Sequence, residues 1–287
     1  MNLQQSDLRT ELHKVKKQQR TKVLRFYGLL TAQMRMVPDF IIIGTQRSGT
    51  TSLYNYLTNH PRILPALMKE VHFFDLAFSK GLNWYRANFP MVSTKEGEQK
   101  MFTGEASPYY IIHPHAPTRI ASLFPSIKLI VLLRNPVDRA YSHYQHEVKL
   151  GFERLSFEDA IKQEPSRLQG EMEKMVGDEN YMSFNHRHFS YLARGIYVDQ
   201  LKNWTKLFPQ EQMLIIKSED FFEWPQKVLS QVFGFLNLPD WSFPGFKVHN
   251  RLQYHEMKAE TRDRLSEYFD PFNQSLNNFL RMDFGWS

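Results

Sequence analysis

The sequence of 287 residues contains no cysteine. This absence excludes disulfide bonds, thiolate metal sites and cysteine nucleophiles, and it favours a reducing compartment. The chain also lacks an uninterrupted apolar run of about 18 residues, and its first residues show no signal-peptide core. We therefore expect a cytoplasmic protein without a transmembrane span.

Acidic residues are scarce only at the N-terminus. Residues 1–36 contain eight Lys or Arg against Asp7 and Glu11, a surplus that equals the formal net charge of +6. The rest of the chain is balanced, so its charge gives no reason to expect a nucleic-acid partner. We expect residues 1–37 to form a basic helical extension, either solvated or in contact with a membrane surface or a protein. Its predicted apolar stripe is Val23, Leu24, Tyr27, Leu30 and Met34.

Apolar runs alternate with helical patterns over residues 38–287, which we expect to form one domain. Three runs are predicted as buried strands: Phe40–Ile43, Lys128–Leu133 and Gln212–Lys217. Helices are predicted from Thr50 to about Thr58, from Asn135-Pro136 to about Val148, and near Pro225–Phe235. Strands that alternate with helices predict an α/β protein, here a P-loop-like three-layer fold with a central parallel sheet flanked by helices.

Two further segments have a predicted structure, an insert over residues 163–188 and a helical region near the C-terminus. Residues 163–188 are polar and weakly periodic, and they predict a long irregular insert, either a lid over a binding site or a plain surface excursion. Residues 259–280 predict two helical pieces that are separated at Pro271.

The stretch "GTQRSGTTSL" follows the first predicted strand and opens a helix. Gly44 and Gly49 allow the backbone to bend around an anion, with the N-H groups of the helix start pointing at it. A nucleoside triphosphatase loop would carry Lys where this chain has Thr50, and it would need an acidic residue after a second strand. The second strand here ends in Arg134 instead. The loop therefore predicts a phosphate site without the triphosphatase apparatus.

Arg134 and Ser142 predict a second phosphate site. If both strands end at the same edge of the sheet, the loop holds one phosphate while Arg134 and Ser142 hold another. The alternatives are that Arg134 pairs with Asp138 on the surface and that Ser142 bonds its own helix backbone. A nucleotide with phosphates at two separate positions fits this arrangement.

The motifs "GTQRSGTTSL", "KEVHFFD" and "LIVLLRNPVDRAYSHYQH" together resemble the sulfotransferases that use 3'-phosphoadenosine 5'-phosphosulfate (PAPS). The resemblance is strongest to the heparan-sulfate and carbohydrate branch and runs from about Pro38 to Trp286. It implies in-line transfer of a sulfuryl group to an acceptor hydroxyl, with 3'-phosphoadenosine 5'-phosphate (PAP) as product and no metal.

The resemblance also implies catalytic roles. Arg47 matches the basic residue that stabilises charge on the leaving oxygen. Glu70 matches the acidic residue that deprotonates the acceptor, and a raised pKa would suit that role. His72 is expected to orient Glu70 or touch the substrate, with a packed core histidine as the alternative.

The same resemblance implies the nucleotide contacts. The 5' end is expected to contact Thr45, Gln46, Arg47, Ser48, Gly49, Thr50 and Thr51. Arg134 and Ser142 are expected to hold the 3'-phosphate. Tyr197, Lys247, Asn250 and Arg251 resemble segments that close over the adenine and the 3'-phosphate. Phe74, Trp84, Tyr85 and Tyr109 are candidates to stack on a sugar or aryl acceptor, with core packing as the alternative.

Two departures bear on the acceptor. Heparan-type members carry Lys where this chain has Ala106 in "GEASPYY", and they close a loop with a disulfide that a chain without cysteine cannot form. A saccharide is the expected acceptor, with a small hydroxylated metabolite or a tyrosyl side chain as alternatives. The competing functions are a Mg²⁺-dependent P-loop nucleotide phosphotransferase and a non-catalytic nucleotide-binding protein.

Overall fold

Five parallel strands form one sheet in the order β2-β3-β1-β4-β5. We describe a computed structural model over residues 22–92, 99–243, 245 and 256–286. The strands are β1 (Phe40–Gly44), β2 (Ile63–Pro65), β3 (Phe102–Ala106), β4 (Lys128–Leu133) and β5 (Met213–Lys217). The three predicted strands are confirmed as β1, β4 and β5, and so is the α/β fold class with a central parallel sheet.

Strand β3 carries no apolar run, yet it lies beside β1 in the middle of the sheet. All five of its residues are buried, including Thr103 and Glu105. Gly104 is required here because a Cβ at this position would lie 2.5 Å from the ring of Phe40 on β1. The pairing with β1 therefore depends on a residue without a side chain, which a search for apolar runs does not find.

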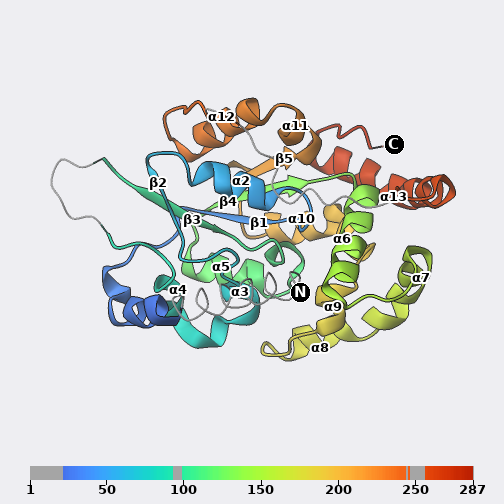
Figure 1. Ribbon diagram of the computed structural model, residues 1–287, viewed down its shortest axis with the longest axis horizontal. Helices are drawn as coiled ribbons and strands as arrows, with labels where there is room; N and C mark the ends of the chain where they lie inside the picture. The colour runs from blue at the N-terminus through green and yellow to red at the C-terminus, as the bar shows by residue number, and fades with distance from the viewer. Residues whose placement is uncertain (1–21, 93–98, 244, 246–255, 287) are drawn as a thin grey trace, which may run out of the picture.

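Helices cover both faces of the sheet, as Figure 1 shows. On one face, Ile41 and Val131 belong to a core cluster that includes Ile120 of α5 (Ala116–Leu123) and Trp204 of α10 (Tyr197–Thr205). On the other face, Ile42 and Leu132 pack with apolar residues of three helices: α2 (Thr50–Leu57), α11 (Ser218–Glu223) and α12 (Pro225–Leu236). Side chains alternate between these two clusters along each central strand, which produces the three layers.

Helix α6 (Pro136–Leu150) leads from the sheet into a helical insert at one end of the molecule (Figure 1). The insert contains α7 (Phe157–Leu168), α8 (Glu171–Gly177) and α9 (Phe184–His188). The prediction of an irregular segment over residues 163–188 is therefore wrong. Side-chain caps start two of these helices, because Ser156 Oγ accepts from Asp159 N and Ser183 Oγ accepts from His186 N.

The C-terminal helix α13 (Ala259–Leu280) is continuous, so the predicted division at Pro271 is also wrong. Leu265 and Phe269 before the proline and Leu276 after it are all buried. Packing of both halves against the domain outweighs the loss of one backbone hydrogen bond at an exposed position.

The described part of the N-terminal extension begins with a helix over residues 22–30 and packs beside α4 (Gly81–Arg86). Arg25 lies over the ring of Trp84, at 4.8 Å from its centroid. Of the predicted stripe, Val23 is 69% and Leu30 72% exposed. The remaining short elements are η1 (Ala32–Met34), α3 (Phe73–Leu76), η2 (Phe78–Lys80), η3 (Tyr110–Ile112), η4 (Ala193–Gly195) and η5 (Gln210–Gln212). Within the described ranges, no helix combines the length and apolar character of a membrane span.

Candidate active site

The loop between β1 and α2 lies at the carboxyl edge of the sheet and is anchored by buried polar groups. Thr45 N donates to Leu132 O of β4 at 2.8 Å, and the hydroxyls of Thr45 and Ser48 lie 2.5 Å apart. From the end of β5, Ser218 Oγ donates to Ser48 O at 2.8 Å. Three neighbouring segments thus fix the loop before any ligand binds.

Gly49 turns this loop into helix α2. Its φ of 91° lies in the left-handed region, and a Cβ would approach the ring of Phe222 at 2.9 Å. The N-H groups of Thr50 and Thr51 follow at the helix start, where the helix dipole favours an anion. The backbone and the hydroxyl-rich sequence therefore fit the phosphate group that the sequence predicts here.

Arg47, Arg134 and Ser142 come together beside this loop. Arg47 Nε donates to Ser142 Oγ at 3.1 Å, and Arg134 Nη1 donates to Arg47 O at 3.1 Å. Asp138 pairs with Arg262 at 2.7 Å, so the alternative of an Arg134–Asp138 ion pair is not formed. Two guanidinium groups and a hydroxyl next to helix N-termini suit a ligand with more than one phosphate.

The other predicted nucleotide residues differ in their position. Tyr197 is buried, and its hydroxyl donates to Arg134 O at 2.8 Å, so its hydroxyl supports the backbone at the end of β4. Lys247, Asn250 and Arg251 lie outside the described residues.

Glu70, His72 and Asp75 form a hydrogen-bonded row where the chain enters α3. His72 Nε2 lies 3.0 Å from Glu70 Oε2, and His72 Nδ1 lies 2.7 Å from Asp75 Oδ2. Burial alone would lower the pKa of His72, but the two carboxylates raise it to about 10. His72 is therefore protonated at neutral pH and donates to both neighbours.

The pKa of Glu70 is lowered, contrary to the expectation of a raised value. Burial would raise it, but the hydrogen bond from His72 and the charge of Lys69, whose Nζ lies 3.4 Å from Glu70 Oε1, outweigh burial. Glu70 is consequently ionised at neutral pH and can accept a proton. The cation that the family carries at the position of Ala106 is absent, and Lys69 brings an ammonium group to the carboxylate instead.

Residues at the end of β3 hold the segment that carries Glu70 and His72. Ser107 Oγ accepts from Val71 N and from His72 N, both at 3.1 Å, and donates to Glu105 Oε2 at 2.7 Å. Burial raises the pKa of Glu105 to about 7, although the hydroxyl groups bonded to it counteract this shift. The "GEAS" stretch at the end of β3 thus holds the backbone that carries Glu70 and His72.

Two residues of this region were not singled out from the sequence. Burial and the charge of Arg47 lower the pKa of His146, while Glu70 raises it slightly, so His146 lies within electrostatic reach of both. Its signal was the four-residue spacing from Ser142, which places both on one face of α6. The second residue is Arg194, buried and bonded through Nη1 to Gln46 Oε1 of the loop. Arg194 lies three residues before Tyr197, and no local pattern there indicates its contact with the distant Gln46.

Of the four candidate stacking residues, Phe74 and Tyr85 are fully buried in the aromatic core, which is the core-packing role that was expected as the alternative to stacking. Trp84 is covered by Arg25 and Lys80. Tyr109 lines a cavity beside α9, and its hydroxyl lies 2.7 Å from His186 Nδ1.

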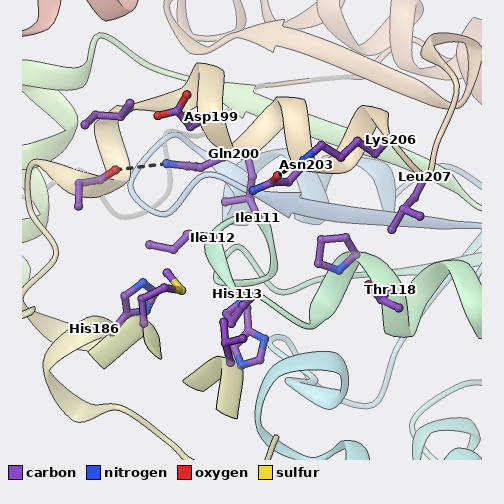
Figure 2. Close-up of a pocket in the computed structure, with 16 residues that line it drawn as sticks. Ile111, Ile112, His113, Thr118, His186, Asp199, Gln200, Asn203, Lys206 and Leu207 are labelled. Atoms are coloured by element: carbon purple, nitrogen blue, oxygen red, sulfur yellow. Dashed lines mark hydrogen bonds between the residues drawn. The ribbon is translucent and has the colours of Figure 1, made fainter. Parts of the chain in front are cut away.

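Two cavities lie near this region, on either side of α8. The larger has a volume of 660 Å³ and is lined by α10, η3, α5 and α8, with His113 and His186 on its wall (Figure 2). Neither the phosphate loop nor the Glu70 segment lines it. The smaller, of 160 Å³, begins at Leu76, directly after Asp75, and extends to Arg187 and His188. The smaller cavity is the one next to the acid–base residues.

Comparison with known proteins finds sulfotransferases that match most of the chain. A family model described as "Sulfotransferase domain" matches residues 37–283. The chain is 30% identical to "Membrane-associated sulfotransferase kil1" of Dictyostelium discoideum, over 87% of this chain and 66% of that protein. It is also 30% identical to human "Heparan sulfate glucosamine 3-O-sulfotransferase 3A1", over 90% of this chain and 64% of that protein. The chain thus spans about two thirds of the length of these relatives.

A solved structure agrees with the fold. The crystal structure of a sulfotransferase from Alicyclobacillus acidocaldarius has a TM-score of 0.68 and 28% sequence identity, and it covers 88% of this chain and 99% of its own.

Proposed function

The chain belongs to the sulfotransferase family, and on this premise we propose that it transfers a sulfuryl group from PAPS to a hydroxyl group of a carbohydrate. The single observation that carries the proposal is the convergence of Arg47, Arg134 and Ser142 beside the β1–α2 loop. Glu70 and Arg47 both lie within electrostatic reach of His146 on α6, which places the carboxylate in the same region. Heparan-sulfate relatives support the carbohydrate acceptor. Small-molecule and tyrosyl acceptors are the alternatives.

PAPS supplies the sulfuryl group and the leaving phosphate. The acceptor oxygen forms a bond to sulfur while the bond between sulfur and the 5'-phosphate oxygen breaks. The acceptor proton passes to the Glu70 carboxylate, and the electron pair leaves with PAP. Arg47 stabilises the charge that grows on the leaving oxygen more than it stabilises the ground state.

His72 holds the Glu70 carboxylate in place. Because its imidazolium donates to both Glu70 and Asp75, the ring cannot itself accept a proton at neutral pH. Glu70 is therefore the base, and His72 is the residue that orients it. His72 could act as the base only if its imidazole were neutral.

Isothermal titration with 3',5'-ADP, the product nucleotide, tests the donor site against Mg·ATP. We expect micromolar affinity for 3',5'-ADP in the wild type and a loss of roughly 10- to 100-fold in Arg134→Ala, because a charged hydrogen-bonding group is removed. Preference for Mg·ATP would support the phosphotransferase alternative, and binding of neither nucleotide would reject the proposal.

Glu70→Gln tests the catalytic role. The amide cannot accept the acceptor proton, so we expect kcat to fall roughly 10²- to 10⁴-fold while affinity for 3',5'-ADP stays within about twofold. A variant with unchanged turnover would favour a different base, and a protein that binds 3',5'-ADP but never turns over would favour the non-catalytic alternative.

A further inference from the structure

The cavity of 160 Å³ lies between the catalytic segment and the helical insert. One end is formed by Leu76, which follows Asp75, and the other by the turn that carries Arg187 and His188. A water molecule occupies about 30 Å³ of liquid, so this volume has room for a group of about the size of one ring. A long polymer would leave the cavity after a single unit.

Most of its wall is apolar. Leu76, Met175 and Phe184 line it, and the apolar surface continues outward through Met182, 65% exposed, to Phe152, 44% exposed. The rings of Phe152 and Phe184 meet edge to face at 5.4 Å. Such a surface favours an acceptor with an apolar face.

The carboxylates around the cavity already have partners. Asp75 is bonded to His72, Glu147 accepts from His188 at 2.8 Å, and Glu171 is bonded to Ser183 and Lys174. Arg187 lines the cavity, and its guanidinium makes no hydrogen bond or ion pair with any residue in the described ranges. Arg187 therefore contributes a positive charge that no nearby carboxylate balances.

The backbone of Arg187 is held from inside the domain. Arg194 Nη2 donates to Arg187 O at 2.5 Å and to His186 O at 2.9 Å. Through Nη1 the same guanidinium contacts Gln46 of the phosphate loop. One buried side chain thus sets the distance between Arg187 and the loop that binds the donor.

We propose that this cavity binds the acceptor and that Arg187 binds one anionic group on it, a carboxylate or a sulfate, while the apolar wall contacts the rest. This inference rests on the proposed function and narrows its acceptor class. The acceptor is a short molecule with a single acidic group and an apolar face, and not an extended polyanion. Arg187 is a specificity-determining residue, and Arg194 is a positioning residue.

The test uses the full chain, PAPS and matched acceptors, with release of PAP as readout. The pair 2-naphthol and 6-hydroxy-2-naphthoate differs only in a carboxylate, as do methyl xyloside and methyl glucuronide. An N-sulfated heparan chain represents the polyanions. We expect the charged member of at least one pair to be preferred at least tenfold in kcat/KM over its partner and over the heparan chain.

In Arg187→Gln, KM for the charged member is expected to rise roughly 10- to 100-fold with little change in kcat, while rates with the uncharged member stay the same. Arg187→Lys should keep part of the preference. Lys162→Gln, an exposed cation on α7, is the control and should behave like wild type. Because Arg194 also contacts Gln46, Arg194→Lys should raise KM for the acceptor and lower the affinity for 3',5'-ADP.

Four outcomes would each overturn the inference. The enzyme could use the charged and uncharged members of both pairs equally, or it could prefer the heparan chain. Arg187→Gln could lose activity equally on both members of a pair, or none of the probes could be turned over. Titration with 3',5'-ADP separates this failure from that of the proposed function. If the nucleotide binds and its affinity depends on Arg134, the donor site stands even when the acceptor inference does not.

Discussion

At the scale of single residues, the site depends on the charge state that each group receives from its neighbours. Glu70 is 31% exposed in its side chain, and Asp75 is fully buried. A protonated His72 between them donates to both carboxylates, and it lets Glu70 stay ionised in a partly dry site. The acid–base behaviour therefore belongs to the row of three residues and not to Glu70 alone.

His72→Asn should move the acid limb of the rate–pH profile to higher pH. His72 lowers the pKa of Glu70 through a hydrogen bond and a positive charge, and asparagine removes the charge. Because Glu70 must be ionised to accept a proton, a higher pKa means that activity is lost at a higher pH as the solution is acidified. The measurement is kcat/KM for the acceptor with the highest turnover between pH 4 and 8, where model carboxyl and imidazole groups titrate.

His115→Gln is the control for this profile, since His115 bonds the backbone of α8 and has no contact with Glu70 in the described chain. An acid limb that stays in place in His72→Asn, or moves to lower pH, would contradict the assignment of Glu70 as the base.

At the scale of elements, the residues of the candidate site lie at the carboxyl ends of the strands. Thr45 follows β1, Ser107 follows β3, Arg134 follows β4 and Ser218 begins α11 after β5. Each makes a hydrogen bond to a loop of the site. In a parallel sheet these ends meet at one edge, which is why segments distant in sequence converge there.

Ser107→Ala should disturb catalysis without direct contact to the reacting atoms. The substitution leaves Val71 N and His72 N without their acceptor, so we expect the free energy of unfolding to fall by ~1–3 kcal/mol and kcat to fall as Glu70 loses its placement. Urea denaturation and turnover measure the two effects. Ser122→Ala, which removes only a bond to the carbonyl of Arg119 in its own helix, is the control. Full kcat in Ser107→Ala would show that Glu70 is held by other contacts.

Pro271→Ala should stabilise the protein. The proline lies inside α13 at an exposed position, where it removes one backbone N-H from the helix. Alanine restores the donor, and we expect the free energy of unfolding to rise by ~1–3 kcal/mol in urea denaturation. Pro225→Ala is the matched control, because Pro225 stands at the start of α12, where no hydrogen bond is lost, and should give no gain. Destabilisation by Pro271→Ala would mean that the helix requires a local bend there.

The same elements show what the sequence could predict. Continuous apolar runs identify β1, β4 and β5 because a strand buried on both faces needs them. Strands β2 and β3 escape this search, since β2 has three residues and β3 carries Gly104 and Glu105 for reasons of packing and hydrogen bonding across the chain. The glycine-framed loop after β1 and the stretch that carries Glu70 are local motifs, so the sequence alone can single them out as candidates. Arg194 and the Ser107 support depend on contacts between distant segments, which no local pattern encodes.

At the scale of the whole molecule, one face of the N-terminal helix remains uncovered. Val23, Phe26 and Leu30 are each more than 60% exposed and recur at helical spacing, and Met34 of the following η1 is 61% exposed. The opposite side of this helix packs on the domain through Arg25, and the segment 1–36 carries a charge surplus of six. An apolar face next to basic sequence is complementary to an anionic lipid surface.

We therefore expect the protein to sediment with vesicles that contain about a third phosphatidylserine, and less with pure phosphatidylcholine, because basic residues near the surface add to the apolar contribution. Phe26→Glu combined with Leu30→Glu should abolish sedimentation without changing 3',5'-ADP affinity. Trp224→Glu is the control, because Trp224 is an aromatic residue elsewhere on the surface that is 58% exposed. If the wild type and the Phe26→Glu, Leu30→Glu variant bind equally to phosphatidylserine and phosphatidylcholine vesicles, this face has no specific role in membrane binding.

The position of β1 has a consequence for synthesis of the chain. Its five buried residues pair with β3 and β4, so they find both neighbours only after residue 133 has been made. At about 5–20 residues per second, the ribosome needs roughly 5–20 s to reach that point after β1 emerges. During that interval the apolar run that later becomes the centre of the sheet is exposed in the nascent chain, and it is a natural recognition site for chaperones that bind such runs.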